Sequence, residues 1–135
     1  MTAVDTSVLI DVFGADARFG AASGHALRTC LNEGSVVVCD VVWSETRVAF
    51  ASDEAFAQAM TTLQIGYSAL TEQAASAAGV ICRKYRSPGG RRDRVIADFL
   101  IGAHALSQCD RLLTRDRGYY RKFFTGLVVV EPAPQ

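Results

Sequence analysis

The sequence predicts an α/β fold, in which helices cover both faces of a central parallel β-sheet. Short apolar segments alternate with longer amphipathic segments along all 135 residues, which is the order produced by repeated strand–helix units. A continuous, mostly β-branched run spans Ser35–Cys39, as expected for a strand buried on both faces. Several apolar segments end in an acidic or hydroxyl side chain, and ligands gather at that end of the strands in such folds.

Length and composition indicate one domain over residues 1–135. At 14.5 kDa the chain can bury a core without disulfides or structural metals. No apolar run reaches the ~20 residues of a membrane-spanning helix, and the N-terminus lacks the pattern of a signal peptide. A soluble, cytoplasmic protein is the simplest expectation.

The N-terminal stretch begins as an apolar strand, reaches Asp5 and resumes as a helix. Because a first strand is usually central in this fold class, Asp5 is expected at the carboxyl edge of the sheet. The elements expected after it are a helix over Val8–Phe13, a loop over Gly14–Gly24, a helix from a Ser23 cap to Asn32 that stops at Gly34, the strand Ser35–Cys39, a helix over Val41–Ala51 capped by Asp40, a helix from Asp53 to Leu63, a strand over Ile65–Leu70, and a helix from a Thr71 cap to Tyr85.

Glu45 is the most informative single residue. Its neighbours three and four positions away are apolar: Val41, Val42, Val48 and Ala49. This spacing predicts a carboxylate in the middle of an apolar helix face. A buried carboxylate persists only with a cation, a hydrogen-bond network or a raised pKa. The alternative is a helix rotated so that Glu45 reaches solvent at the edge of the core.

In the second half, a long helix is expected from an Asp93 cap over Arg94–Gln108, with Asp98 at the border of its apolar stripe. A surface ion pair with Arg94 would also explain Asp98. Gly102 lies on the same side, so another backbone could approach the helix there. The remaining elements are a strand-to-loop unit over Arg111–Asp116 that places Thr114 and Asp116 at its carboxyl end, a short helix over Arg117–Phe124, and a strand over Leu127–Val130.

Charge is unevenly distributed although the formal net charge is zero. Residues 1–82 carry three basic and nine acidic side chains, and residues 83–122 carry eleven basic and four acidic, which gives −6 and +7. This asymmetry suits either a polyanionic partner or a self-complementary assembly. The cations around the Pro-Gly-Gly loop suit a solvated loop and phosphate-backbone binding equally well. The candidate RNA-binding cations are Arg83, Lys84, Arg86, Arg91, Arg92 and Arg115.

The expected topology brings four carboxylates to one edge of the sheet: Asp5, Glu45, Asp98 and Asp116. At ~4 Å and an effective dielectric constant of ~20, each like-charge pair costs about 4 kcal/mol, so the cluster needs a cation or must hold protons or splay. Hard oxygen ligands suit Mg²⁺ or Mn²⁺. The four cysteines form no CxxC pair and are expected to be buried apolar side chains, and His25 and His104 stand alone on helices.

Four segments, taken in order, resemble PIN-domain ribonucleases of the VapC toxin type. They are Val4–Ile10 (VDTSVLI), Ser44–Glu45, Ile96–Ala105 (IADFLIGAHA) and Leu112–Asp116 (LLTRD). Their order and separation match over essentially the whole chain. Ser7 stands where many relatives have Asn, which removes one possible amide contact.

The resemblance implies a PIN-like three-layer sandwich and an acidic site made of Asp5, Glu45, Asp98 and Asp116, with Asp5, Asp98 and Asp116 as metal ligands. Thr6 and Thr114 carry over as hydroxyls that orient those ligands. The family further implies Mg²⁺- or Mn²⁺-dependent cleavage of RNA by a toxin that inhibits translation, forms a homodimer and is neutralised by a cognate antitoxin.

Direct attack of a metal-activated water on a phosphodiester fits both lines of argument, since these motifs offer no candidate His, Cys or Lys nucleophile. Two alternatives remain open from the residues alone. One is a non-catalytic binding module for nucleic acid or protein, in which Glu45 and Asp98 merely pair with arginines. The other is a different Mg²⁺-dependent phosphoryl-transfer hydrolase, although no second Asp follows two residues after Asp5.

Overall fold

The structure, a computed structural model, describes residues 1–86 and 96–133. Within them, five strands form a single all-parallel sheet in the spatial order β3-β2-β1-β4-β5. This confirms the predicted fold class. The strands are β1 (Thr2–Val4), β2 (Val36–Val38), β3 (Ile65–Tyr67), β4 (Arg111–Leu113) and β5 (Val129–Val130).

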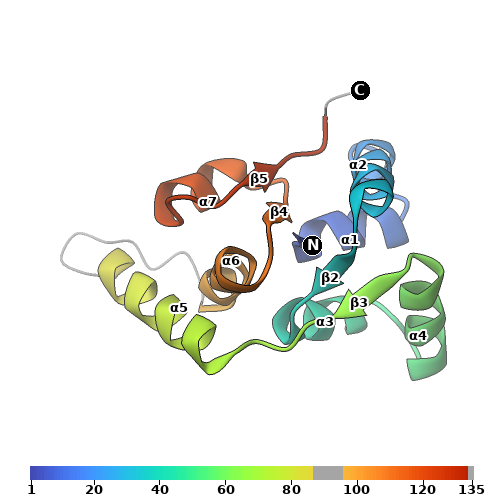
Figure 1. The fold of residues 1–135 in the computed structure, drawn as a ribbon. Coiled ribbons are helices and arrows are strands. Elements are labelled where there is room, and N and C mark those ends of the chain that lie inside the picture. The colour runs from blue at the N-terminus through green and yellow to red at the C-terminus, as the bar shows by residue number, and fades with distance from the viewer. Residues whose placement is uncertain (87–95, 134–135) are drawn as a thin grey trace.

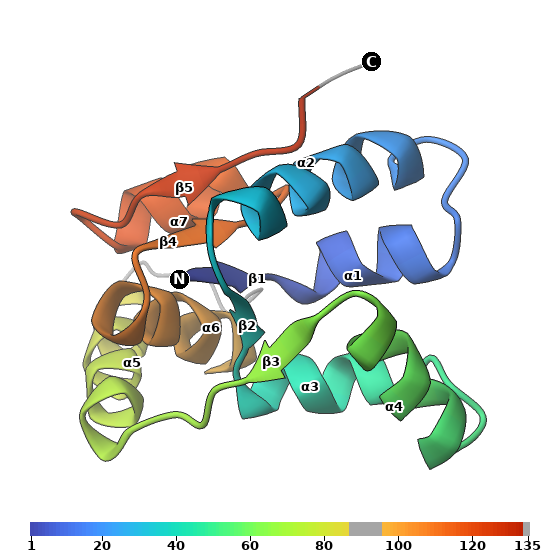
Figure 2. The ribbon, with the colours of Figure 1, turned by 45° about the vertical axis from the view of Figure 1, so that its right-hand side comes forward.

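Helices cover both sides of this sheet. In Figure 1, α5 and α6 lie on one side of the strands while α1 and α2 lie on the other, and the turned view of Figure 2 keeps the two pairs apart. The helices of each pair pack against each other, and α6 contacts β1 and β4. The helices are α1 (Thr6–Phe13), α2 (Gly20–Glu33), α3 (Asp40–Arg47), α4 (Asp53–Thr62), α5 (Glu72–Tyr85), α6 (Ile96–Gln108) and α7 (Arg117–Phe123).

The central position of β1 decides where the site forms. β1 pairs with β2 on one side and with β4 on the other, with Ala3 opposite both Val37 and Leu112. Because every pairing is parallel, the carboxyl ends of the strands meet at one edge of the sheet. Asp5 directly follows β1 at that edge, and Thr114 directly follows β4, as the sequence predicted.

Two helix starts differ from the prediction. The helix α2 begins at Gly20, so Ser23 is not its cap but a fully buried residue inside it. The helix α3 begins at Asp40, so its N-cap is Cys39 and not the predicted Asp40, and it ends at Arg47 instead of Ala51. The predicted cap Thr71 is confirmed, since its hydroxyl accepts a hydrogen bond from the Ala74 N–H. The predicted Asp93 cap and Arg94 lie outside the described residues.

The sheet and the helix faces enclose one apolar core, whose largest fully buried side chains include Tyr120, Phe99, Phe124 and Leu9. A Cβ atom built on Gly102 would lie 2.4 Å from the Phe124 ring. The close approach that the sequence suggested at Gly102 is therefore made by an aromatic ring and not by another backbone.

Packing explains the cysteines and one of the two histidines. Three cysteines are buried and Cys109 is half-buried, and all four are free thiols. His104 is buried, with its Nε2 atom 2.9 Å from the Ser68 hydroxyl oxygen. Burial lowers the pKa of His104, which favours the neutral ring. Across the described ranges, no helix is long and apolar enough to cross a membrane.

Candidate functional site

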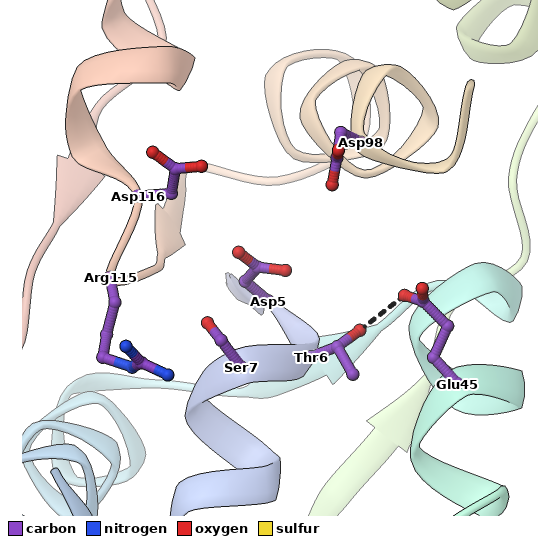
Figure 3. A pocket seen from close by; sticks show the side chains of 7 residues that line it. All are labelled: Asp5, Thr6, Ser7, Glu45, Asp98, Arg115 and Asp116. Carbon is purple, nitrogen blue, oxygen red and sulfur yellow. Dashed lines mark hydrogen bonds between the residues drawn. The ribbon is translucent and has the colours of Figure 1, made fainter. Parts of the chain in front are cut away.

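A polar pocket of about 440 Å³ opens at the carboxyl edge of the sheet. Figure 3 shows the Asp5 carboxylate at its centre, with the other three predicted carboxylates around it. These four side chains come from four separate segments of the chain: the β1–α1 junction, α3, the start of α6 and the residue before α7. The residues that line the pocket are Asp5, Thr6, Ser7, Glu45, Asp98, Arg115 and Asp116.

Asp5 is held at the base of this pocket by the strands beside it. Its N–H donates to the Leu113 carbonyl oxygen at 2.9 Å, which continues the pairing of β1 with β4. Its side chain is only 9% exposed, and the Thr114 hydroxyl donates to Oδ2 at 2.7 Å. Burial raises the pKa of the Asp5 carboxyl and the nearby charges of Asp98 and Glu45 raise it further, against the opposing effect of its hydrogen bonds. Two of the charges that act on the Asp5 carboxylate are therefore negative.

Glu45 lies in the predicted place but for a different reason. It is exposed and not embedded in an apolar face, and Val48, expected on that face, is 85% exposed. The helix α3 buries Val42 and Thr46 instead, one turn apart, and ends before Val48. The alternative of a rotated helix was correct. Glu45 is fixed at the pocket by the Thr6 hydroxyl, which donates to Oε1 at 2.7 Å (Figure 3).

Asp98 and Asp116 complete the acidic wall. Asp98 lies in the first turn of α6, half-buried beside the fully buried Phe99. Asp116 precedes α7, and its N–H donates to the Thr114 hydroxyl oxygen at 3.0 Å. One hydroxyl thus links the main chain of Asp116 to the carboxylate of Asp5, which agrees with the orienting role that the family resemblance implies for Thr114.

The donor set fits a hard divalent cation. Four carboxylates and two hydroxyls line the pocket, and oxygen donors of this kind are those that Mg²⁺ and Mn²⁺ prefer. The Ser7 Oγ atom is buried without a hydrogen-bond partner in the described part of the chain, and Figure 3 shows it turned toward the carboxylates. An unpaired buried hydroxyl beside Asp5 fits a water or an ion in the pocket.

The same carboxylates do not form a closed cluster by themselves. Within residues 1–86 and 96–133, no three His, Cys, Asp or Glu side chains are close enough together to make a ready metal site. Mutual repulsion accounts for this spacing, because like charges at ~4 Å repel by about 4 kcal/mol at an effective dielectric constant of ~20.

Arg115 borders the pocket through a contact that the sequence did not reveal. Its Nε donates to Oδ2 of Asp11 at 2.7 Å and its Nη2 to Oδ1 at 3.2 Å. Asp11 is buried, and its Oδ2 also accepts from the Ser23 hydroxyl at 2.8 Å. The available signal was an acid in the apolar run Val8–Phe13, the feature that drew attention to Glu45. Buried carboxylates thus occur at both ends of α1, and within residues 1–86 and 96–133 an arginine pairs with Asp11 but not with Asp5.

Three of the other predicted RNA-binding cations lie outside this pocket. Arg83, Lys84 and Arg86 are exposed at the C-terminal end of α5 and are not among the residues that line this pocket. Arg91 and Arg92 lie outside the described residues. An RNA-binding role for these side chains stays a prediction.

Comparison with known proteins agrees with this geometry. The model of the PIN domain family matches residues 2–123. No protein of curated function matches the sequence.

Several solved structures share the fold over nearly the whole chain. VapBC2 from Rickettsia felis bound to a DNA fragment from their promoter has a TM-score of 0.74 and 12% identity, covering 96% of this chain and 97% of that one. A toxin–antitoxin complex from Klebsiella pneumoniae has a TM-score of 0.66 and 20% identity, with both chains fully covered. FitAcB from Neisseria gonorrhoeae has a TM-score of 0.70 and 20% identity, with 98% of each chain covered.

Proposed function

The chain belongs to the PIN domain family, and from this premise we propose that it is a metal-dependent endoribonuclease and the toxin of a toxin–antitoxin module. PIN domains are nucleases. The observation that carries the proposal is the convergence of Asp5, Glu45, Asp98 and Asp116 on one pocket from four separate segments. A packing role does not explain this arrangement, because converging carboxylates repel one another.

Asp5, Asp98 and Asp116 would hold Mg²⁺ or Mn²⁺. When bound, the metal lowers the pKa of a coordinated water and offsets the charge that develops on the scissile phosphate. The chain's own residues supply the rest. Thr114 holds the Asp5 carboxylate, and Thr6 holds Glu45 at the rim, where Glu45 is exposed and can accept a proton from an attacking water.

The pocket favours direct attack by water over a covalent intermediate. No His, Cys or Lys is among the described side chains that line it, and Asp5 is buried. The water therefore provides the oxygen that forms the new P–O bond, and the leaving oxygen departs as the other RNA end.

The toxin assignment rests on the comparisons. Structures that share this fold over 96% or more of the chain are described as VapBC, FitAB or toxin–antitoxin complexes. We propose on this basis that a cognate antitoxin binds this chain, that the chain forms a homodimer, and that RNA cleavage inhibits translation in the cytoplasm.

Cleavage of a panel of cellular RNAs in Mg²⁺, in Mn²⁺ and in EDTA tests the activity. Glu45→Gln and Asp98→Asn are each expected to reduce cleavage at least about 100-fold, since Glu45 would accept the proton of the attacking water and Asp98 would hold the metal. Glu54→Gln is the matched control, because Glu54 is an exposed acid in the first turn of α4. Cleavage that persists in EDTA, or in Asp98→Asn at the rate of the control, would contradict the proposal.

A further inference from the structure

A second pocket of about 440 Å³ adjoins the acidic one, and Arg115 lines both. Its walls come from the first turn of α2 with the loop before it and from the chain after β5. Unlike the acidic pocket, it combines cations with an aromatic ring and apolar side chains. The residues that line it are Arg18, Phe19, Ala22, Arg115, Glu131, Pro132 and Ala133.

Phe19 is the centre of this second pocket. The guanidinium carbon of Arg115 lies 4.0 Å from the centroid of its ring, and that of Arg18 lies 4.8 Å from it. Both cations are within the distance at which a ring face attracts positive charge. Cationic and aromatic side chains therefore lie together in this pocket, and unstacked RNA bases stack on aromatic rings and on guanidinium planes.

The side chains of the second pocket are held in place before any ligand binds. Asp16 Oδ1 accepts hydrogen bonds from the N–H groups of Arg18 and Phe19, at 2.9 and 2.7 Å, which fixes the loop. Asp11 fixes the Arg115 guanidinium through two hydrogen bonds. The negative charge of Glu131, the acid in the pocket, is offset by Arg117, whose Nη1 atom lies 3.6 Å from Glu131 Oε2. Preorganised groups of this kind lose little conformational entropy on binding.

We propose that this second pocket is a subsite for one nucleotide of single-stranded RNA, next to the nucleotide whose phosphate is cleaved. The inference rests on the proposed nuclease function and adds where one nucleotide of the RNA substrate binds. The base stacks against Phe19 and the guanidinium planes, and the phosphate of the same nucleotide lies by Arg18. The volume is in the range of pockets for small ligands, and a cationic neighbour offsets the repulsion between the acidic wall and a polyanion.

Equilibrium binding of short fluorescein-labelled single-stranded RNA, measured by anisotropy in EDTA, tests the subsite without cleavage. The comparison probe is the same RNA with abasic nucleotides. Stacking of one base contributes ~1–3 kcal/mol, so wild-type protein is expected to bind the base-containing RNA roughly 5- to 100-fold more tightly. Phe19→Leu keeps the apolar bulk but lacks the ring and should lose this preference, whereas Phe19→Tyr should keep it.

The cation is tested by salt dependence. Arg18→Gln should weaken the binding of both RNAs. It should also reduce the slope of log affinity against log salt concentration by about 0.7, the value for one contact to a single-stranded phosphate. The matched control is Arg28→Gln, because Arg28 is an exposed arginine of α2 that does not line the pocket. Circular dichroism and thermal unfolding establish that each variant is folded.

Unchanged preference for bases in Phe19→Leu, or an unchanged salt slope in Arg18→Gln, would overturn the subsite. So would variants that bind RNA normally and lose only the binding of the antitoxin, since the second pocket would then belong to a protein partner. The two proposals fail separately. If the protein cleaves RNA but Phe19→Leu does not change the preference for bases, only the subsite is ruled out. If the preference depends on Phe19 but the protein cleaves no RNA, only the nuclease function is ruled out.

Discussion

Two buried aspartates, Asp5 and Asp11, lie at opposite ends of α1 and differ in how their negative charge is compensated. Asp5 is 9% exposed and Asp11 is 3% exposed. Asp11 receives two hydrogen bonds from Arg115 and one from Ser23, so its negative charge is balanced within the chain. Asp5 accepts a hydrogen bond from the Thr114 hydroxyl. Burial raises its pKa, and the negative charges of Asp98 and Glu45 raise it further.

The difference separates a structural carboxylate from one that requires a ligand. Burying a charge is costly unless a partner or an ion compensates it. Arg115 compensates Asp11 in the folded chain, whereas the acids around Asp5 add to its cost. We expect the first site to stabilise the protein by itself and the second to do so only when a cation binds.

The largest expected effect comes from breaking the balanced site. Arg115→Ala leaves Asp11, whose side chain is 4% exposed, with only the Ser23 hydroxyl. Removing one partner of a buried pair costs about 3–5 kcal/mol, and the lower end applies because the Arg115 side chain is 32% exposed. Urea unfolding at neutral pH measures the change, with Arg28→Ala as an exposed-arginine control within about 0.5 kcal/mol of wild type. A loss of less than about 1 kcal/mol in the free energy of unfolding would show that Arg115 does not compensate Asp11, so the two aspartates would not differ in this respect.

The unbalanced site should respond to metal. At a Mg²⁺ concentration 100 times the dissociation constant, binding to the folded state adds about 2.7 kcal/mol to the free energy of unfolding. Mg²⁺ titrations, with thermal unfolding as the readout, measure this gain in stability. Glu54→Gln should gain as much as the wild-type protein, and Asp5→Asn should gain little. Equal stabilisation of both variants would place the metal away from Asp5.

Removing the Asp5 charge should stabilise the metal-free protein. Because the pKa of Asp5 is raised in the folded state, its contribution to stability is fully present below its ordinary pKa of 3.8 and is lost as pH rises through the raised value. Asp5→Asn avoids that loss and keeps an acceptor for the Thr114 hydroxyl. We expect a gain of about 0.5–2 kcal/mol at neutral pH, the usual range for stabilising substitutions at functional positions.

Denaturant unfolding of wild type and Asp5→Asn in EDTA, repeated from pH 4 to pH 7, measures this gain. The difference between the two proteins should widen as the pH rises. A difference that is independent of pH, or a less stable variant at neutral pH, would show that the Asp5 charge is already balanced.

The smallest expected effect is at Ser23. Its hydroxyl is fully buried and donates to Asp11, and loss of one such hydrogen bond costs about 1 kcal/mol. Ser23→Ala should be additive with Asp5→Asn, since the two act on different carboxylates. It should not be additive with Arg115→Ala, because Arg115 and Ser23 share Asp11. Unfolding of the double variants distinguishes the two cases.

The sequence was sufficient to predict the parallel sheet, the central β1 and the four carboxylates at one edge, because strand ends and their polar successors are local features. It did not predict partners distant in the chain. Asp11 and Arg115 are 104 positions apart, and nothing in the sequence around either residue indicates that the other is its partner. Glu45 was selected by an apolar spacing that α3 does not use, because that helix ends at Arg47 and leaves Val48 in solvent.

The place of β1 between β2 and β4 also sets when the pocket can exist. During synthesis the first strand emerges early, but its partner β4 and the Asp116 beside it follow more than a hundred residues later. A ribosome-bound fragment that stops before residue 111 lacks one edge of β1, the hydroxyl that holds Asp5 and one of the four carboxylates. The pocket is therefore completed only after β4 and Asp116 have been synthesised, and a fragment that stops before them is expected to lack the proposed metal site.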